Sequence, residues 1–386
     1  MIFARKTGPL AGIRIIEMEG IGPAPLAAML LADLGAEVLR IERMTAGSAG
    51  IQRPREFDFG TRGRVAIPVD IKHEDGRALV LDLVAKADGL IEGFRPGVME
   101  RLGLGPEDCL ARNQKLAYGR LTGWGQTGPL ASTAGHDLNY LALTGVLDRL
   151  GRAGDAPTAP VNLLGDYAGG SLLMAFGLLA AILSARTTGQ GQVVDAAMVD
   201  GVSLLAVPLL GLIGAGIHDR ERGENLLDSG APHYDVYRCA DGQWLSVAPI
   251  EAKFRALLLD GLGLDASSFP NVNIKGNWPE ARRLIGARLA TQPRDHWVEI
   301  FANSDACVTP VLNFDEAMAH DHNVARAAHV EVAGRLQPAP APRFSATPAA
   351  VPEATPRGGY EAAEAVALWG IEPHRMEALK ASGVVA

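Results

Sequence analysis

Residues 12–42 decide the fold class, because a helical pattern lies there between two strand patterns. The stretch begins Gly12-Ile-Arg-Ile-Ile-Glu-Met18 and ends Val38-Leu-Arg-Ile-Glu42, and both segments are short apolar runs typical of buried strands. Between them, residues 25–34 have helical apolar spacing and stop at Gly35, where a C-terminal helix cap is expected. A strand, a helix and a strand within about thirty residues predict a βαβ unit.

The same alternation continues along the first half of the chain. Further strands are predicted at 65–71, 89–93 and 116–122, a helix at 74–87, and a strand or the start of a helix at 193–198. Because parallel strands need crossover connections, this order predicts a parallel sheet covered by helices on both faces. The predicted class is therefore α/β, with a Rossmann-like parallel sheet in a large domain.

The second half of the chain has a different pattern. A polar stretch at 218–230 precedes two strand segments, 234–238 and 244–248, and Asp241-Gly242 between them predicts a hairpin. Helices are expected near 254–261, 279–290 and 360–369, and the proline- and alanine-rich residues 337–356 predict an extended connection. We expect three parts: a large domain at 1–217, a smaller α+β domain with its linkers at 218–330, and a segment returning to the large domain at 331–386.

Composition narrows the class of protein. A net charge of −8 with 21% charged residues argues against a nucleic-acid surface, although it allows a local basic patch for a small anion. Cys109, Cys239 and Cys307 are odd in number and widely separated, which predicts free thiols in a reducing compartment. With no secretory signal at the N-terminus and no peroxisomal tripeptide at the C-terminus, we expect a cytoplasmic protein.

Two apolar runs, 171–183 and 202–217, are candidate membrane spans. Both are shorter than the roughly 20 apolar residues that cross a bilayer. They are therefore expected to be buried helices, and no membrane association is expected.

Two short motifs have competing interpretations. Gly123-Trp-Gly-Gln-Thr-Gly128 matches GxGxxG, but Pro129 follows it and its strand comes late in the chain, so a glycine-rich substrate loop is favoured over a nicotinamide site. His320-Asp-His322 suggests a metal, but residues two apart do not share a helix face, so a solvated helix end is favoured. No metal site and no cofactor are expected.

His136, Asp166 and Glu251 are the candidate acid–base residues. His136 and Asp166 are thirty positions apart, and Asp166 stands at the start of a long apolar segment that predicts a helix over 166–186. Spacing alone favours a structural interpretation of each: a buried histidine, a helix N-cap aspartate and an exposed charge. Side chains of these types can nevertheless move protons without a metal.

Several longer motifs occur in one order along nearly the whole chain, from about Pro9 to the 350s. They are Leu31-Ala-Asp-Leu-Gly-Ala36 with residues 40–43, Phe94-Arg-Pro-Gly-Val-Met-Glu-Arg-Leu102, Gly135-His-Asp-Leu-Asn-Tyr140, Gly165-Asp-Tyr-Ala-Gly-Gly170, Thr188-Gly-Gln-Gly-Gln192 with Asp195, Gly230-Ala-Pro-His-Tyr234 and Asp305-Ala-Cys-Val-Thr-Pro310. In these motifs the sequence resembles the alpha-methylacyl-CoA racemases of the family III CoA-transferase superfamily.

The resemblance implies an isomerase that interconverts (R)- and (S)-2-methylacyl-CoA thioesters. It implies that His136 and Asp166 form the catalytic acid–base pair and that Glu251 pairs with the histidine. It also implies an interlocked homodimer, in which the large domain of one chain and the small domain of the other form the active site. The implied contacts to the CoA thioester come from Arg43, Val69, Asp70, Ile71, Lys72, Arg95, Gly135, Asp137, Leu138, Asn139 and Tyr140.

The sequence departs from the family pattern in places. Members often carry Lys-Arg-Ser after a glycine before the third strand, whereas Gly63 is here followed by Arg64-Val-Ala66. Glu19 and Ile21 replace small or apolar residues after the first strand. These differences concern the region where nucleotide contacts are implied.

The implied reaction needs two acid–base groups on opposite sides of one carbon, because a proton leaves one face and another returns to the other. If Asp166 opens its helix, the first-turn N–H groups are candidate donors to the enolate oxygen. The rival within the family is a CoA-transferase in which Asp166 is a nucleophile that forms an anhydride. A transferase does not need a facing histidine, so His136 and Glu251 favour the racemase and also argue against a catalytically silent CoA-binding protein.

Overall fold

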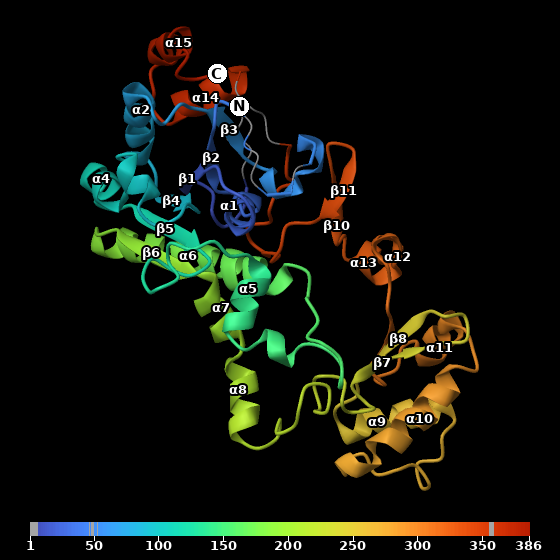
Figure 1. The fold of residues 1–386 in the computed structure, drawn as a ribbon. Coiled ribbons are helices and arrows are strands. Elements are labelled where there is room, and N and C mark those ends of the chain that lie inside the picture. The colour runs from blue at the N-terminus through green and yellow to red at the C-terminus, as the bar shows by residue number, and fades with distance from the viewer. Residues whose placement is uncertain (1–6, 46, 48–49, 52, 355–358) are drawn as a thin grey trace. The chain divides into compact units, whose positions relative to one another are not determined.

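The computed structural model describes residues 7–45, 47, 50–51, 53–354 and 359–386. Their contacts divide the chain into two compact units. Unit 1 comprises residues 1–144, 161–205 and 324–386, and unit 2 comprises residues 145–160 and 206–323. The ribbon in Figure 1 follows the chain through both units.

Unit 1 is built on a parallel sheet of six strands in the order β3-β2-β1-β4-β5-β6. This is the strand order of Rossmann folds, and it confirms the predicted α/β class with a parallel sheet. The strands are β1 (Arg14–Met18), β2 (Glu37–Glu42), β3 (Val65–Pro68), β4 (Gly89–Glu92), β5 (Ala117–Thr122) and β6 (Gln192–Ala197).

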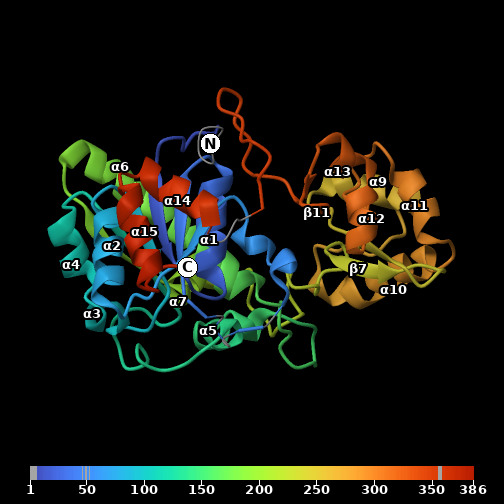
Figure 2. The same ribbon diagram turned by 90° about the horizontal axis from the view of Figure 1, so that it is seen from above.

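Both faces of this sheet are covered, because successive residues of a buried strand point to opposite sides. Ile15 belongs to a core formed with helices α1 and α6, whereas its neighbour Ile16 belongs to a core formed with α2, α14 and α15. Figure 2 shows the C-terminal helices α14 and α15 beside α2. The helices of unit 1 are α1 (Pro23–Asp33), α2 (Glu74–Val84), α3 (Val98–Arg101), α4 (Pro106–Arg112), α5 (Asp137–Leu143), α6 (Leu173–Thr188), α7 (Met198–Leu205), α14 (Gly359–Leu368) and α15 (Pro373–Ala381).

A π-helical segment, Leu163–Leu172, runs directly into α6. Together they form one helix of 26 residues that is long and apolar enough to cross a membrane, and half of its most apolar stretch is buried within the chain. The helix is therefore longer than the apolar run 171–183 indicated. Core helices of soluble proteins share these properties, so length and composition do not place this helix in a bilayer.

Unit 2 contains a three-stranded antiparallel sheet in the order β7-β8-β9 with helices packed on it. The hairpin predicted at 234–248 is confirmed as the β7–β8 pair. Its core includes Tyr237, Leu245, Trp297 and Phe301. The elements are β7 (Asp235–Arg238), β8 (Trp244–Val247), β9 (Val308–Pro310), α8 (Val207–Gly214), α9 (Ala252–Leu262), α10 (Trp278–Leu289), α11 (Arg294–Phe301) and α12 (Phe314–Ala319).

The unit boundaries differ from the sequence-based domains at three places. Residues 145–160 and 206–217, expected in the large domain, group with unit 2, and residues 324–330, expected in the small domain, group with unit 1. Polar contacts account for the first segment: Arg152 pairs with the Asp235 carboxylate at 2.6 Å, and Arg222 donates to the carbonyl of Asp155 at 2.6 Å. The partners in these contacts are far apart in the sequence. The placement of residues 145–160 in unit 2 therefore could not be predicted from local sequence patterns.

The C-terminal part of the chain holds elements that the sequence patterns did not predict. After α13 (Asp321–Ala325), β10 (His329–Val332) and β11 (Arg335–Pro338) form an antiparallel pair, and residues 339–354 contain neither helix nor strand. Helix α15 follows the predicted helix α14. Val385 then pairs with Val69 beyond β3, so the segment ends against the sheet.

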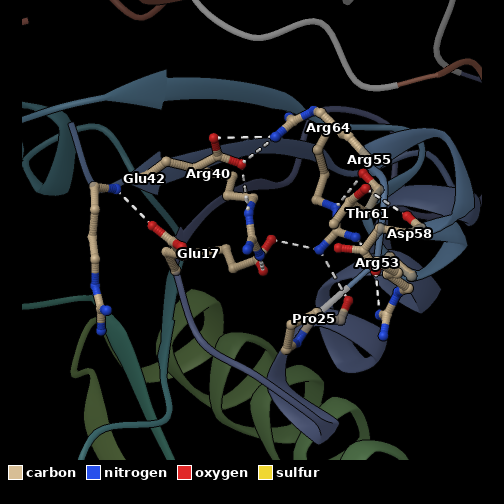
Figure 3. A network of polar contacts seen from close by, with 12 residues as sticks. Glu17, Pro25, Arg40, Glu42, Arg53, Arg55, Asp58, Thr61 and Arg64 are labelled. Atoms are coloured by element: carbon tan, nitrogen blue, oxygen red, sulfur yellow. Dashed lines mark hydrogen bonds and ion pairs between the residues drawn. The ribbon is translucent and has the colours of Figure 1, made fainter. Parts of the chain in front are cut away.

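A buried network of charges lies where β1, β2 and the segment before β3 meet (Figure 3). The Glu17 carboxylate accepts hydrogen bonds from Arg40 and Arg64, and all three side chains are buried. Arg40 also pairs with Glu42 at 3.1 Å. Because burial of an unpaired charge is costly, Glu17 offsets the desolvation of two guanidinium groups at once.

We predict that Glu17→Gln lowers the free energy of unfolding by about 3–5 kcal/mol, because it leaves the fully buried Arg64 without its counter-charge. Urea unfolding followed by circular dichroism measures this change. The matched control is Glu377→Gln on the exposed face of α15, which should change the value by less than about 0.5 kcal/mol. Equal stabilities of the two variants would contradict the role given to Glu17.

Candidate active site

The predicted substrate-contacting residues lie beyond the carboxyl ends of the sheet strands. Arg43 follows β2, Val69 follows β3, Arg95 follows β4, and Gly135 lies in the loop and helix region after β5. Ligands of open parallel sheets bind at this edge, at the point where the strand order reverses. Here the order reverses between β1 and β4. Strands β2 and β3 lie on one side of β1, and the chain then returns to place β4, β5 and β6 on the other side.

Asp166 is the fourth residue of the π-helical segment. Its half-buried carboxylate accepts a hydrogen bond from Asn162 Nδ2 at 3.2 Å. Asn162 occupies the N-cap position of this helix, so the N-cap interpretation of Asp166 is wrong. The helix begins three residues before the predicted start, because Leu163, Leu164 and Gly165 already belong to the π-helical segment.

The loop after β1 brings helix α1 next to Asp166. Gly22 has φ +67°, and a Cβ built on it would lie 3.6 Å from Asp166 Oδ2. This backbone conformation is open to glycine and strained for other residues. The side of Asp166 that faces α1 is therefore shaped by backbone, not by side chains.

Asp137 connects the motif at 135–140 with the motif at 165–170 through a hydrogen bond. Its Oδ1 accepts the backbone N–H of Asp166 at 2.8 Å, across 29 positions of the chain. Gly165 allows this approach, since a Cβ there would lie only 2.6 Å from Asp137 Oδ1. The second carboxylate oxygen of Asp137, Oδ2, is buried without a hydrogen-bond partner.

His136 is exposed and stands at the N-cap position of α5. Its backbone N–H donates to Asn139 Oδ1 at 3.0 Å, which fixes the start of the helix. The next turn is held by Tyr140, whose hydroxyl donates to the carbonyl of Gly135 and whose ring packs edge-on against Trp124 with centroids 4.8 Å apart. The buried-histidine interpretation of His136 is therefore wrong, because its side chain faces solvent.

The surroundings of Asp166 shift its pKa upward. Burial contributes most, the bond from Asn162 opposes it, the negative charge of Asp137 raises the pKa further, and the charge of His136 lowers it. His136 is thus close enough for electrostatic coupling with Asp166. A carboxyl group whose pKa rises toward neutrality is better matched to donating and accepting a proton near pH 7.

The residues implied to contact CoA differ in exposure. Arg43, Lys72, Arg95, Leu138 and Asn139 are exposed, whereas the side chains of Val69, Asp137 and Tyr140 are buried. Asp70 accepts the backbone N–H of Lys72 at 3.0 Å, and its own N–H donates to the carbonyl of Val384, so this turn is held by the C-terminal segment.

Glu251 lies in unit 2, at the N-cap position of α9, and is exposed. His136 and Asp166 lie in unit 1. The structure therefore brings together the first two candidate catalytic residues, and the pairing of Glu251 with His136 stays a prediction.

Arg64 explains one departure from the family pattern. Its guanidinium is fully buried and donates to Glu17 and to the carbonyls of Gly60, Thr61 and Pro25, and burial lowers its pKa. This cation therefore belongs to the buried charge network of Glu17.

Neither of the two short motifs has the geometry of the site that its pattern suggested. The loop at 123–128 leads into turns and not into a helix, since the next helix begins at Asp137, so no dinucleotide phosphate site forms there. In the other motif, His320 Nδ1 accepts the backbone N–H of His322 at 3.2 Å. Across the part of the chain that the structure describes, no group of three or more His, Cys, Asp or Glu side chains is arranged to hold a metal ion.

Sequence reasoning missed Glu92, which is buried at the carboxyl end of β4 beside the reversal point. Burial raises its pKa to about 7, against the opposing effects of the Phe94 N–H at 2.7 Å and of Arg120 at 2.9 Å. Glu92 is the last residue of β4 and follows the apolar residues Leu90 and Ile91. A charged residue at the end of an apolar strand was the sequence feature that could have marked it as a candidate. Asn162 was also missed, because its interaction with Asp166 depends on the π-helical turn.

Residues 10–361 match the model of the family described as CoA-transferase family III. The chain belongs to this family. It is 41% identical to an alpha-methylacyl-CoA racemase of Mus musculus, over 97% of each chain, and 43% identical to that of Homo sapiens, over 88% of this chain and 87% of the human protein.

A solved relative supports the fold of this family III protein. The crystal structure of a CAIB/BAIF family protein from Brucella suis superposes with a TM-score of 0.80 at 25% identity, over 94% of this chain and all of that one. The identity to racemases over most of the chain supports an isomerase.

We predict that Asp137→Asn lowers the pKa of Asp166, because it removes a negative charge while the amide oxygen still accepts the Asp166 N–H. The ¹³C chemical shift of the Asp166 carboxyl group, followed against pH in aspartate-labelled protein, gives this pKa. Asp200→Asn on the exposed side of α7 is the control and should leave it unchanged. A higher or unchanged pKa of Asp166 in Asp137→Asn would show that the charge of Asp137 does not raise the pKa of Asp166.

Proposed function

We propose that this protein is an alpha-methylacyl-CoA racemase that interconverts (R)- and (S)-2-methylacyl-CoA thioesters. The observation that carries the proposal is the hydrogen bond from the Asp166 N–H to Asp137, which holds His136, the residue before Asp137, near the half-buried Asp166 carboxylate at the carboxyl edge of the sheet. The identity to curated racemases over most of the chain supports the same reaction.

The reaction removes the α-proton from one face of the substrate and returns a proton to the other. In one direction the Asp166 carboxylate accepts the proton and protonated His136 donates one; in the other direction the roles reverse. Each correctly placed acid or base contributes about 10²–10⁴-fold to the rate. The intermediate is an enolate whose charge resides largely on the thioester oxygen.

Hydrogen-bond donors must stabilise that oxygen. The Asp166 N–H already donates to Asp137, so it is not available for this role. Asp137 Oδ2 and Trp124 Nε1 are buried without partners in the same region, which is typical of a site that a ligand or water completes. No metal or redox cofactor is required by this chemistry.

CoA binding is proposed for the exposed cations along the same edge. Arg43 follows β2 and Arg95 follows β4, the strands on either side of β1, and Lys72 precedes α2. These side chains suit the phosphate groups of a nucleotide, because guanidinium and ammonium groups donate charge-assisted hydrogen bonds to phosphate oxygens. Glu251 is proposed as the carboxylate partner that keeps the His136 ring in one orientation.

The test is to incubate one epimer of a 2-methylacyl-CoA with the enzyme in D₂O. We predict α-deuterium incorporation together with formation of the other epimer, and a loss of at least about 10²-fold in exchange for His136→Ala and Asp166→Ala. Retention of full exchange in both variants would contradict the assignment.

A CoA-transferase would give a different result. It would transfer CoA from the thioester to a free acid, and hydroxylamine would capture an acyl group on Asp166. Such capture without α-exchange would replace the racemase proposal with acyl transfer.

We also propose a homodimer, supported by apolar side chains that unit 1 leaves exposed on one helix. Leu172, Phe176 and Leu183 are 55%, 73% and 67% exposed, and Val193 is exposed on the edge strand β6. Clustered apolar side chains of this size typically mark an interface.

We predict that sedimentation equilibrium gives twice the chain mass of 40.6 kDa for the wild type. Phe176→Glu should give the monomer, because it places a charge on the exposed helix face. Phe314→Glu is the matched control, since Phe314 is 89% exposed on α12 and lies outside this group. A monomeric wild type, or a dimeric Phe176→Glu variant, would contradict this interface.

A further inference from the structure

Unit 2 contains a cavity of about 320 Å³ that the proposed reaction does not use. It lies between helix α9, helix α10 and the loop at 269–273. The volume is at the low end for small-molecule sites, which excludes a whole CoA and suits a short ligand. The lining residues are His233, Ala252, Arg255, Ala256, Leu258, Leu259, Ala266, Phe269, Pro270, Asn271, Val272, Asn273 and Ile285.

His233 is the buried polar residue of this cavity. It is 6% exposed, and its Nδ1 atom has no hydrogen-bond partner. Burial and the charge of Arg255 lower its pKa to about 4, so the ring is neutral near pH 7. A buried ring nitrogen without a partner costs free energy, unless a ligand or water completes its hydrogen bond.

Arg255 supplies positive charge to the same cavity. Its guanidinium donates to the carbonyl of Ile250 and to Asn273 Oδ1, which uses two of its five N–H donors. Among the described residues, no carboxylate lies within ion-pair distance of Arg255, and none of the residues that line the cavity is acidic. The guanidinium is therefore placed to receive an anion.

The rest of the lining is apolar. Ala252, Ala256 and Leu259 form one stripe of α9, and Phe269 and Ile285 come from the opposite wall. A ligand that fits this cavity has an anionic group that contacts Arg255 and His233. It also has a short hydrocarbon chain that packs against the apolar wall. A divalent cation is excluded by the positive charge, and an inorganic anion would leave the apolar wall unfilled.

We propose that this cavity binds a short-chain aliphatic carboxylate, whose carboxylate group contacts Arg255 and His233. The site lies one helical turn from Glu251, because Arg255 N–H donates to the Glu251 carbonyl in the first turn of α9. Binding there is a property of unit 2 and does not depend on the racemase assignment.

The test is isothermal titration calorimetry of the full chain with hexanoate and, as the neutral probe of equal size, hexanamide. We expect saturable binding of hexanoate at least about tenfold tighter than that of hexanamide, because a hydrogen bond to a charged group is worth more than one tenfold step in affinity. Equal affinity for both probes, or no saturable hexanoate binding up to about 10 mM, would overturn the proposal.

Three variants locate the site. Ala256→Leu fills the cavity from an exposed position of α9 and should weaken hexanoate binding at least about tenfold, whereas Ala287→Leu on the exposed side of α10 should not. Asp166→Ala should bind hexanoate like the wild type, which separates this cavity from the proposed active site. Wild-type affinity in Ala256→Leu, or lost affinity in Asp166→Ala, would place the carboxylate elsewhere.

His233→Phe tests the polar end of the cavity. It should weaken hexanoate binding more than hexanamide binding, because a hydrogen bond to a charged carboxylate is worth more than one to a neutral amide. Thermal unfolding of each variant shows whether it is folded. An unchanged preference for hexanoate over hexanamide in folded His233→Phe would contradict the role of His233.

Discussion

Asp137 accepts the backbone N–H of Asp166 across 29 positions of the chain, and the arrangement of the candidate site depends on this contact. It joins the first residue of α5 to the first turn of the π-helical segment. His136 precedes Asp137 directly, so the same bond that holds the Asp166 backbone also holds the histidine near it. The negative charge of Asp137 then contributes to the raised pKa of Asp166.

The π-helical start of the long helix is the second feature on which the site relies. A π-helical turn has wider spacing than an α-helical one, and such turns are frequent at functional sites. Here it spans Leu163–Leu172 and includes Gly165, Gly169 and Gly170, all buried. Ser171 closes the segment by donating to the carbonyl of Pro23 at 2.8 Å, which connects it to the start of α1. Backbone therefore approaches Asp166 from α1 as well as from its own helix.

Much of the fold could be predicted from the sequence, because the strands of the parallel sheet contain short apolar stretches that are separated by helical patterns. Ile15 and Ile16 in β1 and Val38 and Leu39 in β2 are examples, and the βαβ order follows from their spacing. Helix α15 and strands β10 and β11 were not predicted. Their buried apolar residues, such as Met376, Leu379 and Val332, are few and stand between polar or charged residues, so the local pattern is weak.

The sequence predicted which residues belong to the candidate site, but not how they are positioned or what they contact. The motifs identified His136 and Asp166, but Asp166 was expected at the N-cap, and the exposure of His136 was not foreseen. The Asp137–Asp166 bond could not be inferred, because local spacing carries no information on a contact 29 residues apart. The same is true of Glu17, whose partners Arg40 and Arg64 come from two other segments.

The central claim is that Asp166 and His136 act on opposite faces of one carbon, and epimer-resolved exchange in Asp166→Asn tests it most directly. Each 2-methylacyl-CoA epimer is incubated separately with the variant in D₂O, and α-deuterium and configuration are measured together. With one base removed, the account predicts exchange without inversion from the epimer whose proton faces His136, and almost none from the other. Identical exchange from both epimers, or inversion at the wild-type rate, would contradict it.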